Sequence, residues 1–349
     1  MAMKIYYFLP SPLCVFVLKN IMRFILGLFS LSFLVVLGVA VGVTALVYLF
    51  QSSGPLGEDR IVQIKRGQGV REIAQMLQDD DVIMNAYPFM VGAKLKNNGK
   101  PIQAGEYNVP AHASMNDILN MMQNGDVYHR FVTIPEGKTS YEIVEILNES
   151  EVLEGELATI PPEGSLMPET YSYSSGDTRL EKVSQMQEAM NKALADAWEK
   201  RAPDLPFSSS EEALILASIV EKETGVASEY ETVAGVFINR LRLGMPLQTD
   251  PTVIYGMTMG KHKNDGRGPL GRRLLSKDLQ ADTPYNTYTR NGLPPTPICN
   301  PGKGAILAVM NPAKHDYLYF VADGSGGHAF AKTLAEHNSN VAKWRKIRQ

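Results

Sequence analysis

The sequence predicts an α+β protein that carries a single transmembrane helix near its N-terminus. Three observations lead to this fold class. The segment Phe24–Phe50 has no charged residue, short alternating stretches with glycine turns follow it, and helical apolar spacing dominates after residue 164. With 349 residues the chain is long enough for two or three domains. We therefore expect an anchor, a small α+β module and a mostly helical domain with short β elements.

The composition is that of an ordinary globular protein with one apolar segment, because 44% of the residues are hydrophobic and 20% are charged. The formal net charge is −3, so no basic field indicates nucleic acid as a partner. The two cysteines are Cys14 and Cys299, and the first lies in the apolar N-terminal region. A disulfide framework is therefore not expected.

The segment Phe24–Phe50 is long enough to cross a bilayer, since about 20 apolar residues span the hydrocarbon core. Lys19 and Arg23 precede it, and Glu58 and Asp59 follow it. The positive-inside rule then places the short N-terminus in the cytoplasm and the rest of the chain outside it. A cleaved signal peptide is the alternative, but its apolar core would be only about 7–15 residues long. The length of the segment favours an uncleaved anchor.

The N-terminus, residues 1–23, contains another apolar stretch, which is interrupted by Pro10 and Pro12 and is too short to span a bilayer. Met22 begins a charged-then-apolar run that would make a complete anchor by itself. We expect Met22 to be the true start and residues 1–21 to be an over-extended gene start. N-terminal sequencing of the native protein that found residues before Met22 would refute this.

A small α+β module is expected at residues 59–126, after a flexible linker at 51–58. Ile61–Ile64 alternates like a strand, a glycine turn follows, and Val70–Leu77 has the apolar spacing of a helix. With Gly105–Tyr107 as the returning strand, this order resembles the LysM-like module of cell-wall proteins. The alternative is a small packing module without a ligand.

A second strand, turn and helix are expected in residues 127–164. Phe131–Ile134 has the pattern of a strand, Pro135–Gly137 that of a turn, and Tyr141–Leu147 that of a helix. Only the outline of the first module is repeated, so no repeat array is inferred. The acidic segment Glu154–Gly164, which contains two prolines, is interpreted as a hinge.

Residues 165–349 are expected to form one mostly helical domain. Apolar spacing predicts helices at about 180–198, 210–224 and 229–243, and Tyr317–Val321 has the pattern of a strand. The second of these helices has clear end signals. Ser208 or Ser209, each with a glutamate three residues later, forms a capping box, and Gly225 is placed to end the helix.

Glu223, in the last turn of that helix, is the strongest candidate for an acid. Counting back three, four and seven residues places it beside Val220, Ile219 and Leu216. Apolar neighbours and the negative end of the helix dipole both disfavour an ionised carboxylate, so both raise its pKa. A general acid must hold a proton near neutral pH. Glu221 has milder neighbours, and the alternative for either glutamate is a solvated charge.

Long motifs follow one another in the second half of the chain: Leu216–Thr224, Val236–Leu241, Leu247–Gly256, Tyr285–Tyr288, Gly292–Pro295, Pro301–Gly302 and Tyr317–Val321. Together they resemble the YceG/MltG-type endolytic murein transglycosylases, and the match runs from the anchor to about residue 338. The resemblance implies a lysozyme-like transglycosylase domain at 165–349. It also implies an anchor in the bacterial cytoplasmic (inner) membrane, with a periplasmic catalytic domain.

The resemblance further implies cleavage between N-acetylmuramic acid and N-acetylglucosamine without water. One glutamate protonates the glycosidic oxygen and then, as a base, takes the proton from the muramyl 6-hydroxyl, which leaves a 1,6-anhydro end. One carboxylate is then enough, whereas a hydrolase usually needs a pair. The attacking hydroxyl is already tethered to the reacting carbon, so no separate nucleophile has to be brought in.

The same resemblance assigns roles to individual residues. Other lytic transglycosylases place their acid in a Glu-Ser pair, which assigns the acid to Glu223 and an orienting role to Thr224. It implies that Gln248, Tyr285 and Asn286 hold the sugar or an intermediate. The alternative for Tyr285 and Asn286 is a turn after a proline.

Two further acidic residues are candidates for substrate binding. Asp250 precedes Pro251 and either forms a turn or assists as a second carboxylate. Glu169 lies in a segment that resembles a family motif, and it either lines the sugar groove or packs in a loop.

No cofactor and no metal ion are expected. His328, Glu336 and His337 do not have the spacing of a His-Glu-x-x-His helix. The expected partner is the glycan strand of peptidoglycan, and the family implies peptidoglycan synthases as further partners. Two other functions remain open: a hydrolytic muramidase that uses Glu223 with Asp250 or Glu169, and a non-catalytic peptidoglycan-binding scaffold.

Overall fold

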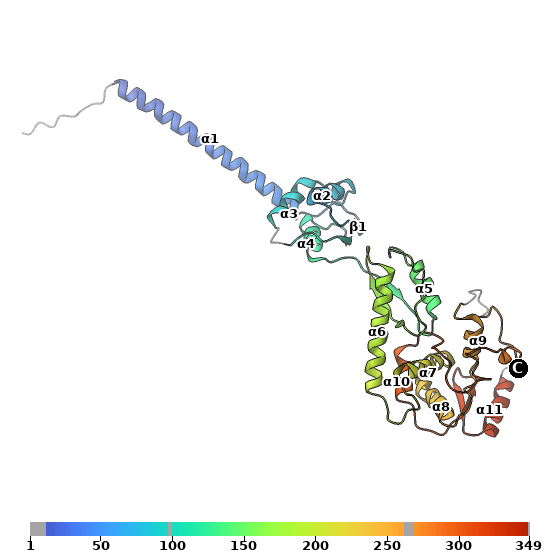
Figure 1. Cartoon of the computed structure of the whole chain (residues 1–349). Coiled ribbons are helices and arrows are strands. Elements are labelled where there is room, and N and C mark those ends of the chain that lie inside the picture. Colours follow the sequence, from blue (N-terminus) through green and yellow to red (C-terminus); the bar gives the residue numbers. More distant parts are fainter. Residues whose placement is uncertain (1–11, 97–99, 262–268, 348–349) are drawn as a thin grey trace, which may run out of the picture. The chain divides into compact units, whose positions relative to one another are not determined.

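The apolar N-terminal segment forms one long helix, α1 (Pro12–Gln51), which contains the predicted helix Phe24–Phe50 and begins twelve residues before it (Figure 1). The structure is a computed structural model that describes residues 12–96, 100–261 and 269–347. By length and composition, Lys19–Gln51 is able to cross a membrane, and its most apolar part is fully exposed. The chain divides into two units between Tyr128 and His129.

The first unit continues from α1 into a two-stranded sheet and three helices. Its elements are β1 (Arg60–Ile64), α2 (Val70–Asp79), α3 (Ala86–Leu95), β2 (Gly105–Val109) and α4 (Met115–Asn124). β1 and β2 are antiparallel, with Arg60 opposite Val109. The predicted strand, helix and returning strand are confirmed, whereas α3 and α4 were not predicted.

The pattern of buried residues explains why α2 was predicted from the sequence and why α3 was not. Ile73 and Leu77 on α2 pack with Tyr107 of β2 in one core, so their spacing in the sequence reflects a helix with one buried face. α3 is apolar on most of its surface and contains Pro88 and Gly92, so it has no polar face from which a helical period could be detected.

The second unit begins with a small α+β part. Its elements are β3 (Arg130–Thr133), α5 (Ser140–Glu149), β4 (Thr170–Tyr173) and α6 (Arg179–Glu199). β3 and β4 are antiparallel, with Val132 opposite Tyr171. The segment 127–164 is therefore paired with residues beyond 164, whereas the sequence suggested a separate segment that ends in a hinge.

Hydrogen bonds to Glu163 fix the end of the segment Glu154–Gly164, which was expected to be a hinge. The Glu163 carboxylate accepts hydrogen bonds from the Ser140 N–H (2.8 Å), the Asn300 side chain (3.1 Å) and the Tyr255 hydroxyl (3.1 Å). Burial raises the pKa of this carboxyl. The end of the segment is thus bonded to three other parts of the same unit.

The remaining elements of the second unit are mostly helical. They are α7 (Ser210–Glu223), η1 (Ala227–Glu229), α8 (Tyr230–Arg242), α9 (Asp250–Thr258), η2 (Asp278–Gln280), α10 (Lys303–Met310), β5 (Tyr319–Ala322), β6 (His328–Ala331) and α11 (Leu334–Ile347). The three predicted helices correspond to α6, α7 and α8, and the predicted strand begins two residues later than expected. β5 and β6 form an antiparallel hairpin, with Phe320 opposite Phe330.

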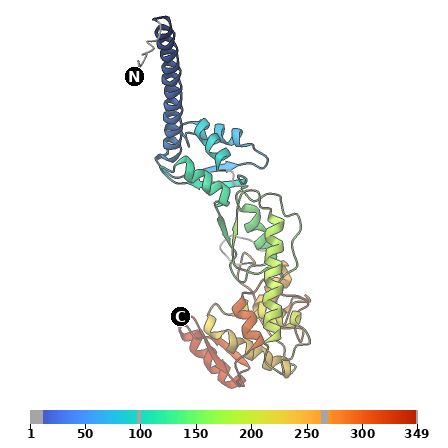
Figure 2. The same ribbon diagram turned by 90° about the vertical axis from the view of Figure 1, so that its left-hand side faces the viewer.

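α6 joins the two parts of this unit, as both views show (Figures 1 and 2). Val183 and Met186 lie in the core that contains β3, β4 and α5. Met190 and Leu194, further along the same helix, lie in the core formed by α7, α8 and α10. The apolar face of one helix therefore contributes to two successive cores, and α7 is enclosed by its neighbours.

Candidate functional site

α7 carries Glu223 as its last residue, which places this carboxylate where the helix leaves the core. Ser209 caps the helix: its side chain accepts a hydrogen bond from the Glu212 N–H, as one of the two predicted caps requires. Leu216, Ile219 and Val220 are fully buried. The apolar stripe that was predicted beside Glu223 is therefore part of the core.

Glu223 lies at the wall of a cavity of about 510 Å³ in the second unit. The lining residues come from α7, α8, the loop before α9, the start of α9, the loop before α10, β5 and α11: Glu223, Phe237, Arg240, Leu247, Gln248, Asp250, Tyr288, Tyr319, Phe320, Val321, Leu334 and His337. Aromatic and polar side chains that converge on one acid are typical of a substrate site.

The environment of Glu223 raises its pKa from 4.5 to about 7. Burial is the largest cause, since a desolvated carboxylate loses favourable hydration. The negative charge of Asp250 adds to this rise, and the positive charges of His328 and Arg240 oppose it. A carboxyl with a pKa near 7 can donate a proton at neutral pH and can accept one afterwards.

Asp250 is the second carboxylate of this cavity. It is the first residue of α9, where the positive end of the helix dipole favours a negative charge. Its Oδ1 accepts a hydrogen bond from the Tyr288 hydroxyl (2.7 Å). Glu223 lies at the negative end of α7, so the two carboxylates occupy opposite electrostatic environments.

Arg240 places a positive charge beside the acid. Its Nε donates to the Leu318 carbonyl (2.7 Å) and its Nη1 to the Leu247 carbonyl (2.7 Å), and its guanidinium lies over the Tyr319 ring. These partners are neutral, so the charge of Arg240 acts on Glu223 without being cancelled by a carboxylate of its own. Burial lowers the pKa of Arg240 from its usual value.

The loop before α9 presents Gln248 to the cavity. Gln248 has a φ of +51°, which is uncommon for a residue other than glycine, and its side chain is exposed. The backbone is held there because the Gln248 N–H donates to the Thr287 carbonyl (3.1 Å). Thr249 follows, and its buried hydroxyl has no hydrogen-bond partner of good geometry among the described residues.

Thr224 lies next to the acid but faces another direction. It is buried; its Oγ1 donates to Glu229 Oε2 (3.2 Å) and accepts a hydrogen bond from the Val226 N–H (3.0 Å). Glu229 also contacts His328 Nδ1 (2.6 Å). Thr224 is therefore used to fix the chain after α7, and it is not a residue of the cavity wall.

Tyr285 and Asn286 lie behind the cavity wall. The Tyr285 hydroxyl is within 2.8 Å of the Thr296 hydroxyl. Asn286 is fully buried; its amide nitrogen donates to the Leu279 (3.0 Å) and Ala281 (2.8 Å) carbonyls, as expected for the turn alternative. Its Oδ1 accepts from the Tyr288 N–H (2.9 Å), so Asn286 holds the backbone that presents Tyr288.

Glu169 and Glu221 do not line the cavity that contains Glu223. Glu169 is exposed just before β4 and does not line the cavity. Glu221 accepts hydrogen bonds from the Gly302 N–H (2.9 Å) at the start of α10 and from the Tyr230 hydroxyl (3.1 Å). Although burial also raises the pKa of Glu221, this carboxylate is bound by structural partners and Glu223 is the one at the cavity.

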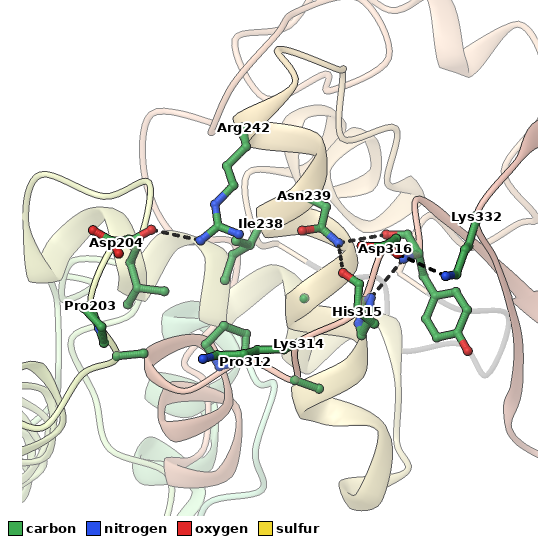
Figure 3. A pocket seen from close by; sticks show the side chains of 15 residues that line it. Pro203, Asp204, Ile238, Asn239, Arg242, Pro312, Lys314, His315, Asp316 and Lys332 are labelled. Carbon is green, nitrogen blue, oxygen red and sulfur yellow. Dashed lines mark hydrogen bonds and ion pairs between the residues drawn. The ribbon is translucent and has the colours of Figure 1, made fainter.

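A larger cavity of about 770 Å³ lies on another side of α8 and lacks the candidate acid (Figure 3). Asn239 and Arg242 line it, and Figure 3 shows them directed toward different loops. The Arg242 guanidinium donates to the Asp204 carbonyl (2.9 Å), and Lys332 pairs with Asp316 (3.0 Å). Size alone therefore does not identify the site.

Sequence reasoning assigned no role to Arg240, Tyr288 or Thr249, and it considered His337 only as a metal ligand. The first three lie inside motifs that were already recognised, which was the available signal. His337 is stacked on Tyr319, and its buried Nδ1 has no hydrogen-bond partner in the described parts of the chain. Within those same parts, no group of three or more histidine, cysteine, aspartate and glutamate side chains is arranged to hold a metal ion.

Comparison with protein families identifies the chain. The model of the YceG-like family matches residues 62–343, which cover the first unit after α1 from residue 62, most of the second unit and every residue of the cavity. The chain belongs to the YceG-like family.

Relatives with curated names support this membership of the YceG-like family. The chain is similar to a protein of Bacillus subtilis (strain 168) named endolytic murein transglycosylase, with 32% identity over 81% of the chain and 84% of that protein. A protein of the same name from Streptococcus pneumoniae is 30% identical over 90% of the chain, which spans 65% of that longer protein. The chain is also similar to a putative YceG-like protein from Listeria monocytogenes whose crystal structure is known. The two are 32% identical, the TM-score is 0.48, and the match covers 81% of this chain and 99% of the Listeria chain.

Proposed function

We propose that this YceG-like protein is an endolytic lytic transglycosylase of peptidoglycan and that Glu223 is its acid and base. The observation that carries the proposal is the pKa of about 7 of Glu223 at the wall of a cavity of about 510 Å³. The names of the relatives supply the substrate class. Cleavage takes place between N-acetylmuramic acid and N-acetylglucosamine.

In the first step, the protonated Glu223 carboxyl gives its proton to the glycosidic oxygen, and the bond from that oxygen to the muramyl C1 breaks. In the second step, the Glu223 carboxylate takes the proton of the muramyl 6-hydroxyl while the 6-oxygen bonds to C1. The products are a free N-acetylglucosamine 4-hydroxyl and a 1,6-anhydro-muramyl end, and no water is consumed. A pKa near 7 suits a group that must act in both directions.

The cavity wall supports this sequence of steps. Positive charge develops on the sugar ring as the bond breaks, and the Asp250 carboxylate is available to stabilise it. The exposed Gln248 side chain is free to bond sugar hydroxyls. Tyr288 orients Asp250 and Asn286 holds the backbone that presents Tyr288, whereas Tyr285 lies behind the wall and Thr224 fixes the chain after α7. Glu169 has no role in this scheme.

The anchor limits where the reaction takes place. α1 spans the cytoplasmic membrane with its N-terminus inside, as the positive residues before it favour. The catalytic unit then acts on glycan close to the outer face, where nascent strands are made, and cleavage there ends their elongation beside the peptidoglycan synthases. The strand–helix–helix–strand order of the first unit supports a LysM-like glycan-binding module.

The second candidate is a hydrolytic muramidase, and the observation that favours it is the presence of Asp250 in the same cavity. A hydrolase would use Asp250 to activate water or to attack the sugar, and its product would be a reducing muramyl end that is heavier by one water.

Product analysis tests both candidates. The full-length protein and its Glu223→Gln variant are incubated with uncrosslinked glycan strands, and the ends are identified by mass spectrometry. Anhydro-muramyl ends that disappear in the variant are the expected result. Reducing ends without anhydro product would overturn the transglycosylase proposal, and no cleavage by folded wild type would favour a scaffold. Undiminished cleavage by Glu223→Gln would remove Glu223 from the mechanism.

A further inference from the structure

One side of α3 is an apolar stripe at the end of the anchor helix. Tyr87, Val91 and Leu95 follow one another at four-residue spacing, so they lie on one side of the helix. Tyr87 is 60% exposed and Leu95 is 80% exposed. Single exposed apolar residues are ordinary on a protein surface, but a contiguous stripe of them indicates an interaction surface.

An apolar cavity of about 250 Å³ lies between α1 and α3, beside this stripe. Its lining residues are Val43, Leu46, Val47, Phe50, Gln51, Pro88, Val91, Gly92, Leu95, Lys96 and Asn116. The two helices are packed closely because the buried Phe50 ring occupies the space that a Cβ on Gly92 would need. α3 is thus held against the last turns of α1.

The length of the anchor places this contact at the level of lipid headgroups. The uncharged segment Phe24–Phe50 is about 40 Å long at 1.5 Å per residue, and about 38 Å along the membrane normal at an average tilt of about 20°. The hydrocarbon core is about 30 Å thick. With Arg23 at the cytoplasmic boundary, the core ends near Val43, and the turns that contact α3 lie in the outer headgroup region.

The charge distribution of the first unit agrees with this placement. No acidic residue occurs from residue 82 to 105, while Lys94, Lys96 and Lys100 all lie in that stretch. Lys94 and Lys96 are exposed next to Leu95. α2, in contrast, ends in the acidic run Asp79–Asp81. Lysines beside apolar and tyrosine side chains are typical of a helix that lies at a membrane surface containing anionic lipid.

We propose that α3 lies in the outer headgroup region of the bilayer, with the Tyr87–Val91–Leu95 stripe toward the acyl chains and a phospholipid chain in the α1–α3 cavity. Lys94 then faces the lipid phosphates, while the Lys96 ammonium donates to Asn116 and Asn120 of α4. The proposal rests on the spanning of the membrane by α1 that is part of the proposed function. Its consequence is that the part of the first unit that follows α1 is held against the membrane surface.

Site-specific fluorescence quenching tests this placement in the full-length protein. Cys14 is replaced by serine and the buried Cys299 is retained. Single cysteines at Tyr87 and Leu95 are labelled with an environment-sensitive fluorophore, as is a matched exposed control at Gln75 on α2. The protein is placed in nanodiscs of phosphatidylethanolamine and phosphatidylglycerol that contain nitroxide-labelled lipid.

We expect quenching at positions 87 and 95 to be at least about threefold stronger than at position 75, because only the stripe enters the interface. Gly92→Leu, which displaces Phe50, should reduce the quenching at position 95. Equal quenching at positions 75, 87 and 95 overturns the proposal, as does crosslinking of position 95 to a second copy of the chain instead of lipid.

A label at Val36, in the middle of α1, separates this proposal from the one on which it rests. Strong quenching at Val36 by mid-chain nitroxide, together with equal quenching at the other positions, overturns only the docking of α3. The absence of quenching at Val36 overturns the membrane-spanning proposal and the docking of α3 with it.

Discussion

Replacing Glu223 with glutamine is expected to abolish glycan cleavage and, at the same time, to stabilise the fold above neutral pH. The folded-state pKa of this carboxyl is about 7, and its ordinary value is 4.5. Between these values the unfolded chain gives up the proton while the folded protein retains it. The contribution of the Glu223 carboxyl to the free energy of unfolding is therefore fully present below about pH 4.5 and is lost as the pH rises through about 7.

The size of this loss follows from the difference between the two pKa values. At about 1.4 kcal/mol for each pKa unit, it amounts to about 3 kcal/mol. For a unit of this size, about 3 kcal/mol corresponds to roughly 6–12 °C in Tm. Glutamine is neutral at every pH, so Glu223→Gln does not suffer the loss. Its Tm should equal that of the wild type near pH 4.5 and exceed it by roughly 6–12 °C at pH 8.5.

Differential scanning calorimetry of the second unit's transition, in detergent and across this pH range, measures the effect. Glu188→Gln on the exposed side of α6 is the matched control, and it should leave the Tm difference near zero at every pH. A Tm difference between Glu223→Gln and wild type that does not change with pH would refute the reasoning, because it would mean that Glu223 is not desolvated in the folded protein.

Three further predictions concern the neighbours of Glu223. Asp250→Asn removes a negative charge that raises the pKa of Glu223, so the alkaline limb of the kcat/KM profile should move to lower pH; a limb that stays in place would show that the two carboxylates are not coupled. Arg240→Met removes a positive charge that lowers this pKa, so the limb should move to higher pH, and a movement to lower pH would contradict the assignment. Glu221→Ala leaves the Gly302 N–H and the Tyr230 hydroxyl without their partner and should lower the free energy of unfolding by about 1–3 kcal/mol, as urea denaturation measures. Cleavage by Glu221→Ala below its unfolding temperature should persist, and its loss in a folded variant would reopen the choice between the two glutamates.

Some features of this protein follow from the sequence alone because they depend on neighbouring residues. The anchor helix is set by the length of an uncharged segment, and α7 by its serine cap and apolar period. The position of Glu223 in the last turn follows from the same local rules. The raised pKa could also be anticipated in direction, since the apolar stripe and the helix end were both visible in the sequence.

Tertiary structure decided which distant residues surround that acid. Arg240 on α8, Asp250 on α9, Tyr288 and His337 are far apart in the sequence, and no local period relates them to α7. Side chains close together in the sequence also point to different places. The Asn286 side chain donates to backbone carbonyls inside a turn, whereas the Tyr288 side chain, two residues later, reaches the cavity.

The two glutamates of α7 show the same division most directly. Sequence placed both near the end of one helix and favoured Glu223 for its apolar neighbours. Only the packing of α10 against α7 determined that the Glu221 carboxylate binds the Gly302 N–H while Glu223 lines the cavity. The physical reason is that helix formation depends on local spacing, whereas the surroundings of a side chain depend on which elements pack against it.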